Sequence, residues 1–145
     1  MKLYIEQSDC YTETEIIIHC SILDRNLQKI IEQIQLVSCV LTVQKDDQTL
    51  LLKPDTVCYL ESVDDKTFVY TEKEVYESQM KLYELEEFLK QASFVRISKS
   101  CILNINYLES VRPLLNGKME ALLSNGEHII VNRHYVPEFK RKFGL

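Results

Sequence analysis

Residues 94–135 read FVRISKSCILNINYLESVRPLLNGKMEALLSNGEHIIVNRHY. This stretch contains two Asn-Gly pairs, Asn116-Gly117 and Asn125-Gly126, and apolar-rich runs flank each of them. An Asn-Gly pair between such runs is the strongest short-range signal for a two-residue β-hairpin turn, because both residues tolerate positive φ. The pattern therefore predicts an antiparallel meander whose register the two turns fix. Its three predicted strands are residues 107–115, 118–124 and 127–131.

Basic and small polar residues lie on both sides of the predicted meander. Cationic and hydroxyl side chains on the connections between strands are suited to binding an anion. The arrangement therefore suggests a sheet that presents loops to an anion. The residues concerned are Arg96, Ser98, Lys99 and Ser100 on one side, and Asn132, Arg133 and His134 on the other.

Several short motifs follow one another along the same stretch. They are FVRISKS at residues 94–100, ILN with Ile105 at residues 102–105, LSNG at residues 123–126 and VNR at residues 131–133. In this succession the sequence resembles the LytTR family of bacterial DNA-binding domains. The usual family pattern is F-x-R-[IV]-H-[RK]-S, a hydrophobic-hydrophobic-Asn step, a strand ending in N-G, and a final Ser-Arg. The resemblance covers residues 41–145 and departs from the pattern at Ser98, where His is commoner, and at Asn132, where Ser is commoner.

The resemblance implies both a fold and a function. The fold would be mainly β (α+β), with antiparallel strands and peripheral helices. The function would be that of a sequence-specific transcriptional regulator, which inserts loops and no recognition helix into successive major grooves of double-stranded DNA. Matched residue by residue, the contact positions of the family fall on Lys66 and Thr67, then on Lys99, and finally on Arg133. Tandem half-sites would require two copies of the chain, so a homodimer on DNA is expected.

The side chains at these positions have suitable chemistry. The Arg133 guanidinium can donate two parallel hydrogen bonds to guanine O6 and N7, worth about 1–3 kcal/mol of discrimination against a wrong base. The alternative for Arg133 is an ion pair with a nearby carboxylate. Lys99 suits either a phosphate or a guanine edge. Ser98 and Ser100 can donate hydroxyls to phosphate, although Ser100 could instead tie down its own loop.

Three further polar residues near the motifs have different expected roles. His134 either reaches the DNA backbone or is ordinary surface. Asn132 belongs to the same predicted contact site as Arg133, and it can also cap a final helix. We assign Asn104 to structure, because an asparagine at this place can hold the turn after strand 102–103.

The net charge of −5 alone argues against nucleic acid, because neutralising phosphates is the main source of affinity there. The distribution of charge favours it. Residues 1–92 contain nine Lys and Arg against eighteen Asp and Glu, a net charge of −9, whereas residues 93–145 contain eight against four, a net charge of +4. An acidic half can discourage indiscriminate binding while a basic face recognises DNA.

Residues 1–40 are predicted to form an appendage to a DNA-binding domain at residues 41–145. Residues 1–6 and 15–20 have the pattern of strands, and Asp24 stands where a helix N-cap belongs. Apolar residues then follow at helical spacing and predict a stripe that packs on the main domain or on a second subunit. This stripe consists of Leu27, Ile30, Ile31 and Ile34.

The rest of the domain is predicted from the same kinds of pattern. Strand pairs are expected at 40–43 with 49–53 and at 67–71 with 75–78, and a single strand at 55–61. Apolar residues at helical spacing predict a helix over residues 81–91 that buries Leu82, Leu85, Phe88 and Leu89. A final helix would hold Pro137 in its first turn, Phe139 and Phe143 on one face, and Gly144 at its end. The basic residues 140–142 of this helix would face solvent or phosphate.

Other classes of function find little support. The chain has only three glycines and no phosphate loop, G-x-S-x-G or H-E-x-x-H motif, so we expect neither an enzyme nor a cofactor. Five cysteines without a C-x-x-C pair favour buried thiols over disulfides, and the spacing of Cys10, His19 and Cys20 matches no zinc site, so no metal is expected. The N-terminus MKLYIEQSDC carries charges where a signal peptide is apolar, and a cytoplasmic location is expected.

Two competing functions stay open. One is a non-catalytic protein-interaction module that has the same β scaffold and uses its acidic half to hold a partner. The other is RNA binding, which is weakened because no aromatic platform for single strands is evident, although Tyr59, Phe68 and Tyr70 lie on consecutive predicted strands.

Overall fold

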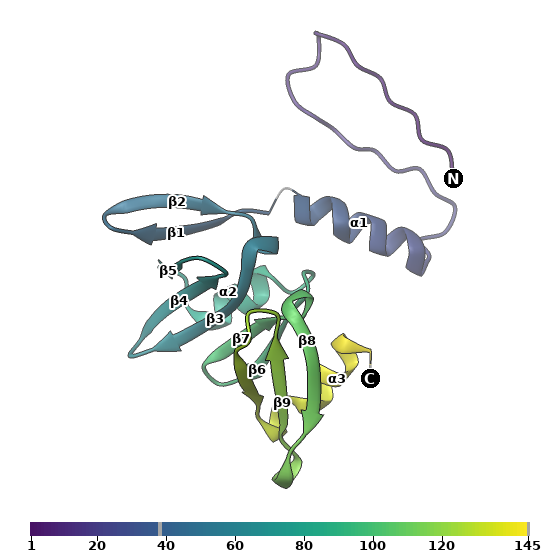
Figure 1. Ribbon diagram of the computed structural model, residues 1–145. Helices are drawn as coiled ribbons and strands as arrows, with labels where there is room; N and C mark the ends of the chain where they lie inside the picture. Colours follow the sequence, from purple (N-terminus) through teal and green to yellow (C-terminus); the bar gives the residue numbers. More distant parts are fainter. Residues whose placement is uncertain (38, 145) are drawn as a thin grey trace.

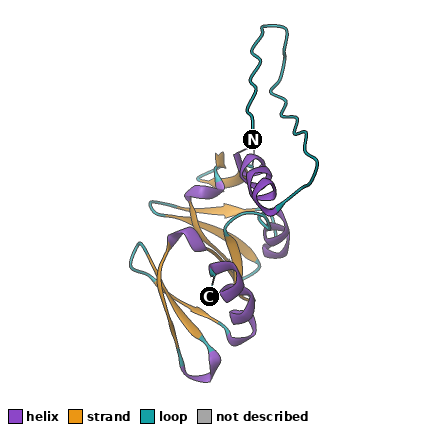
Figure 2. Ribbon diagram, turned by 90° about the vertical axis from the view of Figure 1, so that its right-hand side faces the viewer, coloured by secondary structure: helices purple, strands orange, loops and turns teal. Residues whose placement is uncertain are grey.

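Two antiparallel β-sheets form the body of the computed structural model, which describes residues 1–37 and 39–144. The larger sheet has the strand order β2-β1-β5-β4-β3-β7-β6, and the smaller has the order β10-β9-β8 (Figure 1). Helices lie at the periphery of the sheets (Figure 2). The predicted fold class, mainly β with peripheral helices, is therefore confirmed.

Both predicted hairpins of the larger sheet form, β1 with β2 and β4 with β5, and β3 makes a further hairpin with β4 that was not predicted. Asp46-Asp47 joins β1 to β2, and Asp64-Asp65 joins β3 to β4. All four aspartates have φ between 50° and 63°, the backbone of a two-residue turn whose twist matches that of the strands. The strands are β1 (Leu41–Lys45), β2 (Gln48–Leu52), β3 (Val57–Val63), β4 (Lys66–Thr71), β5 (Val75–Ser78), β6 (Phe94–Ser98) and β7 (Cys101–Asn104).

The predicted meander is the smaller sheet, but its turns are longer than predicted. It consists of β8 (Leu108–Pro113), β9 (Met119–Leu123) and β10 (His128–Val131). The last bonded pairs are Leu114 N with Lys118 O at 2.8 Å and Leu123 N with Glu127 O at 2.9 Å, so each loop holds three residues. In the second loop Gly126 has a φ of 89° and donates to Leu123 O, as in a turn closed by a glycine bulge. The prediction of two-residue turns was therefore wrong.

Three helices and four 3-10 turns complete the described chain. The 3-10 turns are η1 (Pro54–Thr56), η2 (Ile105–Tyr107), η3 (Leu115–Gly117) and η4 (Arg133–Tyr135). The helices are α1 (Arg25–Val37), α2 (Leu82–Phe88) and α3 (Val136–Phe143).

Helices α2 and α3 differ from their predictions at the ends. In α2, Leu82 and Leu85 are buried as expected, but Phe88 ends the helix and is 46 % exposed. Asn132 was expected to cap α3, and this is wrong because η4 intervenes and the Asn132 side chain makes no capping hydrogen bond. Gly144 ends α3 as predicted, with a φ of 86° and a hydrogen bond to Lys140 O.

The predicted strands at residues 1–6 and 15–20 do not form. Residues 1–24 contain neither helix nor strand, and they extend away from the sheets (Figure 1). Ile16 and Ile17 are 58 % and 65 % exposed. An isolated pair of strands is only marginally stable in water, and no described strand pairs with these residues. The predicted helix does form, and Asp24 Oδ1 accepts a hydrogen bond from Leu27 N at 2.8 Å.

Two apolar clusters hold the sheets and helices together, and β6 and β7 contribute to both. Alternate residues of a strand face opposite sides of a sheet. Phe94 and Ile102 therefore pack in a first cluster with α2, whereas Val95, Ile97 and Leu103 pack in a second cluster with α3 and the smaller sheet. Burial of such side chains contributes about 1.5–3 kcal/mol each. Both faces of β6 and β7 are thus buried in apolar clusters.

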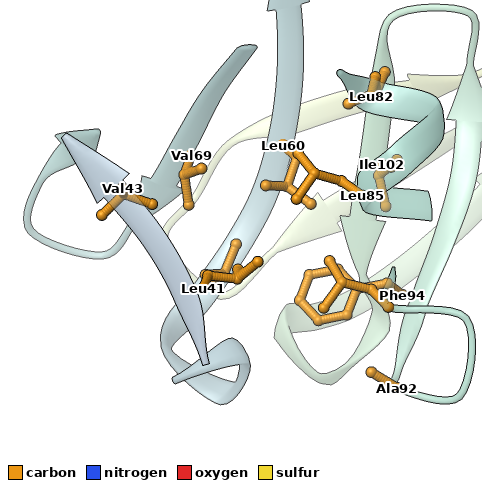
Figure 3. Packing of buried hydrophobic residues seen from close by; sticks show 11 residues of the cluster. Leu41, Val43, Leu60, Val69, Leu82, Leu85, Ala92, Phe94 and Ile102 are labelled. Carbon is orange, nitrogen blue, oxygen red and sulfur yellow. The ribbon is translucent and has the colours of Figure 1, made fainter. Parts of the chain in front are cut away.

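The composition of the first cluster shows how α2 is fixed. Leu60 of β3, Leu85 of α2 and Ile102 of β7 lie together between helix and sheet (Figure 3). The first cluster comprises Leu41, Val43, Val57, Leu60, Val69, Leu82, Leu85, Leu89, Ala92, Phe94 and Ile102. The second comprises Val95, Ile97, Cys101, Leu103, Met119, Ala121, Leu123, Val131 and Phe139. The apolar stripe of α1 belongs to neither.

Candidate nucleic-acid interface

Three surface connections are joined in series by backbone hydrogen bonds. They are the β3–β4 turn (residues 63–66), the β6–β7 turn (residues 98–100) and the β10–η4 junction (residues 132–134). Ser62, the residue of β3 just before the first turn, donates its N–H to Ser100 O at 2.8 Å, which links that end of β3 to the second turn. Asn132 N donates to the O of Ile97, two residues before Lys99 in β6, at 2.9 Å, which links the third connection to the strand that enters the second turn. We call these three connections together the loop edge.

Each connection of the loop edge carries an exposed cation. Lys66, Lys99 and Arg133 are exposed, and none of them enters an ion pair within the described residues. The other arginines of the basic half do: Arg96 pairs with Glu86, Arg112 with Glu120, and Arg141 with Glu138. The alternative of an ion-paired Arg133 is thus not found in this part of the chain.

Arg133 is positioned by the turn between β8 and β9. A Cβ atom added to Gly117 would lie 2.9 Å from Arg133 Cδ and 3.0 Å from Cγ. The aliphatic part of Arg133 therefore passes directly over the backbone of Gly117. The contact leaves the Arg133 guanidinium at the surface. Nothing in the sequence pattern indicates that Gly117 and Arg133 meet.

Thr67 does not lie in an exposed loop. It is the second residue of β4, is only 3 % exposed, and pairs with Ser62 of β3 and Ser78 of β5. The expectation of an accessible Thr67 was wrong, because the two-residue turn ends at Asp65 and the alternation of β4 turns Thr67 inward. Lys66, one position earlier, is exposed.

Serine hydroxyls shape the β6–β7 turn. Ser98 Oγ accepts a hydrogen bond from Ser100 N at 3.2 Å and lies 3.4 Å from Ser100 Oγ. Ser98 is partly buried and Ser100 exposed. Both hydroxyls are thus close to the turn backbone, and the Ser100 hydroxyl is the better placed to reach a ligand.

Two polar residues of the junction and one of β7 complete the predicted set. The partly buried Asn132 uses its backbone to bond Ile97, while His134 is exposed and lies edge to face against Tyr135 at 5.4 Å between ring centroids. The structural role expected for Asn104 is confirmed. Fully buried, it donates to Val57 O at 2.8 Å and accepts from Ser93 Oγ at 2.7 Å.

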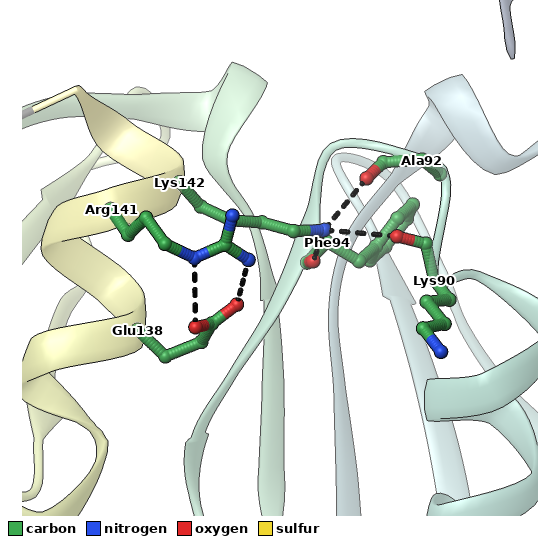
Figure 4. Close-up of polar contacts among 6 residues, drawn as sticks. All are labelled: Lys90, Ala92, Phe94, Glu138, Arg141 and Lys142. Carbon is green, nitrogen blue, oxygen red and sulfur yellow. Dashed lines mark hydrogen bonds and ion pairs between the residues drawn. The ribbon is translucent and has the colours of Figure 1, made fainter.

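The basic residues of α3 are mostly engaged within the protein. The Lys142 ammonium donates to the carbonyl oxygens of Lys90, Ala92 and Phe94 at 3.2, 3.1 and 2.6 Å, while Arg141 pairs with Glu138 (Figure 4). Burial lowers the pKa of Lys142. The expectation that Lys142 faces solvent or phosphate was wrong, because its ammonium donates to two carbonyls between α2 and β6 and to one at the start of β6.

A polar groove of about 420 Å³ borders the β6–β7 turn. Tyr59, Glu61, Ser98, Ser100 and Glu127 are among the residues that line it. The Tyr59 ring stacks on Tyr70 with centroids 4.3 Å apart, and Tyr70 donates to Glu61 at 3.2 Å. The ring faces that Tyr59 and Tyr70 turn to each other are unavailable for stacking with a base. The carboxylates of Glu61 and Glu127 also line the groove and would repel phosphates, so both features disfavour the alternative of RNA binding.

The described residues contain neither a membrane-spanning helix nor a cluster of metal-ligating side chains. No helix among them is long and apolar enough to cross a bilayer. The described residues also contain no group of three or more His, Cys, Asp or Glu side chains that could hold a metal ion.

Comparisons with known proteins agree on one family. The sequence profile described as "LytTr DNA-binding domain" matches residues 47–144. The chain is 32 % identical over 104 residues to the sensory transduction protein LytT of Enterococcus faecalis, an alignment that covers 71 % of this chain and 43 % of that protein. It is 30 % identical over 105 residues to the transcriptional regulatory protein LytR of Staphylococcus aureus strain MW2, covering 72 % and 43 %. The chain thus spans less than half the length of these curated relatives.

A solved structure has the same fold. The LytTr DNA-binding domain of a Bacillus cereus response regulator superposes with a TM-score of 0.69 at 29 % identity. The match covers 73 % of this chain and 97 % of that domain. This family consists of DNA-binding domains, in agreement with the expectation that the chain is not an enzyme. With a profile match over most of its residues and the matching fold, the chain belongs to the LytTR DNA-binding domain family.

Proposed function

We propose that this chain is a sequence-specific transcriptional regulator whose β6–β7 turn and β10–η4 junction enter successive major grooves of double-stranded DNA. The observation that carries the proposal is the loop edge itself. Three connections distant in sequence are bonded in series, and each presents an exposed cation without an intramolecular ion pair in the described residues. Cations held on a common rigid edge are what a polyanionic duplex requires.

The residues of the loop edge divide into base and backbone contacts. Arg133 reads a guanine with two parallel hydrogen bonds. Lys99 contacts a phosphate or a guanine edge, and Lys66 contacts a phosphate. Hydroxyl, amide and imidazole groups supplement these contacts at the DNA backbone, and they come from Ser98, Ser100, Asn132 and His134. Thr67 is not among the contact residues because it is buried.

A homodimer on repeated half-sites in the bacterial cytoplasm completes the proposal. Its support lies in α1, where Ile30 and Ile34 line a surface hollow and belong to neither apolar cluster. In a two-fold symmetric dimer the interface uses the same patch on each copy, so one apolar helix face can serve both. The competing function, a non-catalytic protein-interaction module, is favoured by the exposed apolar side chains at residues 1–23, such as Ile16 and Ile17.

Selection of bound fragments from random DNA, followed by affinity measurements at two salt concentrations, tests the proposal. Arg133→Ala should lose about 1–3 kcal/mol of preference at one base position. Lys66→Ala should weaken binding to every sequence and reduce the slope of log affinity against log salt by about 0.9. Lys99→Ala should weaken binding whichever contact it makes. The matched control is Lys73→Ala, an exposed lysine beyond the opposite end of β4 from Lys66.

The outcomes separate the alternatives. If Arg133→Ala and Lys99→Ala bind the selected fragment as the wild type does, the loop edge is not the contact surface. If the wild type enriches no fragment at either salt concentration, the regulatory function itself fails and the protein-interaction alternative takes its place.

A further inference from the structure

Each of the three guanidinium nitrogens of Arg96 donates one hydrogen bond within the protein. Nε donates to Ser98 O at 2.8 Å, Nη2 to Lys99 O at 2.5 Å, and Nη1 to Glu86 Oε2 at 2.6 Å. Two of these acceptors are backbone carbonyls of the β6–β7 turn. The third is a carboxylate on α2, which the first apolar cluster fixes to the sheet.

The three intramolecular hydrogen bonds are enough to explain why Arg96 lies beside the turn, without a direct contact to phosphate. Its side chain is only 17 % exposed, whereas that of Glu86 is 49 % exposed. A guanidinium has five donors in a fixed fork, so one side chain can hold two carbonyls and a carboxylate at once. Arg96 therefore connects the turn to a rigid helix.

A β-bulge explains why the turn needs such support. The register of β6 with β7 skips Ile97, since Arg96 pairs with Ile102 and Ser98 pairs with Cys101. The skipped Ile97 carbonyl accepts the hydrogen bond from Asn132 N, which links the turn to the β10–η4 junction. The bulge joins the two connections, but it also removes ladder hydrogen bonds just before the turn. Arg96 supplies replacement hydrogen bonds at Ser98 and Lys99.

We propose that Arg96 is a positioning residue for DNA recognition, which holds the β6–β7 turn against Glu86 of α2 so that Lys99 and Ser100 meet DNA in a fixed arrangement. This inference rests on the proposed function. It assigns to Arg96 a role through the turn backbone and no contact with DNA. Preorganisation of this kind lowers the cost of ordering a loop when a ligand binds.

Glu86 gives the proposal its sharpest test. Removing a carboxylate near a DNA-binding edge should strengthen binding if only charge matters, whereas loss of the Arg96 anchor should weaken it. We expect Glu86→Ala to bind the selected DNA about tenfold more weakly, the scale of one lost charged hydrogen bond. The matched control is Glu87→Ala on the same helix, which removes the same charge from a residue whose only ion pair in the described chain is with Lys90 at 3.9 Å. Glu87→Ala should leave affinity unchanged or slightly higher.

Arg96→Lys distinguishes positioning from contact. Lysine keeps the charge but lacks the fork, so the variant should also bind about tenfold more weakly, with an unchanged slope of log affinity against log salt. Arg96→Gln should weaken binding by a similar factor with the same slope. A slope reduced by about 0.9 in Arg96→Gln alone would identify a direct phosphate contact and overturn the proposal.

Amide hydrogen exchange of residues 98–100 in the free protein gives a readout that needs no DNA. Exchange there should accelerate in Arg96→Lys and Glu86→Ala and stay unchanged in Glu87→Ala. Unchanged exchange in the first two variants would refute the positioning role even if the wild type bound DNA. If exchange accelerates in Arg96→Lys and Glu86→Ala but the wild type selects no DNA, Arg96 does order the turn and only the proposed function fails.

Discussion

Gly117 shows how one residue without a side chain controls one with a long side chain. Its φ of 75° is one that L residues rarely adopt, and its Cα faces the aliphatic part of Arg133. The Asn-Gly signal predicts a turn at this place, but it contains no information about the space that the Arg133 side chain occupies next to Gly117. Conformation and space therefore both select glycine here.

Replacement of Gly117 by alanine should separate these two requirements. We expect Gly117→Ala to lose about 1 kcal/mol of unfolding free energy through backbone strain. It should also weaken DNA binding, since the new methyl group displaces Arg133. The control is Gly126→Ala, which has a φ of 89° and nothing within 4 Å of the added Cβ. Urea denaturation and affinity measurements check the pair, and equal affinity of both variants would show that Arg133 does not depend on Gly117.

Residue-level prediction succeeded where chemistry is local and failed where partners are distant. Asn104 was correctly assigned to structure, because an asparagine side chain can hold the turn that follows a strand, here by accepting from Asn106 N. Thr67 was missed because a shift of one position in a strand reverses which face a residue occupies. The roles of Arg96 and Lys142 depend on carbonyls whose positions only the tertiary structure defines.

Elements were predictable when their partners are adjacent in sequence. The hairpins of β1 with β2 and β4 with β5 need only a turn and two alternating strands, and they form as predicted. Residues 15–20 have an equally good strand pattern but no neighbouring strand in the described chain. Propensity alone cannot compensate for a missing partner.

Helix α1 has a complete amphipathic pattern, yet its stripe joins neither apolar cluster. Ile34→Glu should therefore leave the melting temperature of the domain nearly unchanged while it abolishes self-association. Gln28→Glu, on an exposed position of the same helix, is the control for added charge. Sedimentation velocity would check the oligomeric state. A dimer that survives Ile34→Glu would exclude this face as the contact between copies.

At the scale of the whole molecule, burial of thiols makes stability depend on alkaline pH. Burial raises the pKa of Cys101 from 9.0 to about 12 and that of Cys58 to about 11. Cys101 lies in the second apolar cluster, and Cys58 lies in β3 of the larger sheet. In each case the folded state holds the proton more tightly than the unfolded chain does. Their contribution is therefore fully present below pH 9 and is lost as pH rises toward the folded values.

The unfolding free energy should consequently fall above pH 9, with each thiol contributing up to ~1.4 kcal/mol per pH unit. Burial also raises the pKa of Tyr59, so the decline should steepen further above pH 10. Urea denaturation at pH 8, 9 and 10 measures the slope, and Cys101→Ala should make it shallower because one linked proton is removed. Cys10→Ala, at an exposed position in the extended N-terminal segment, should leave the slope as in the wild type. If the unfolding free energies of Cys101→Ala and Cys10→Ala decline in parallel with rising pH, the loss of stability at alkaline pH comes from groups other than the Cys101 thiol.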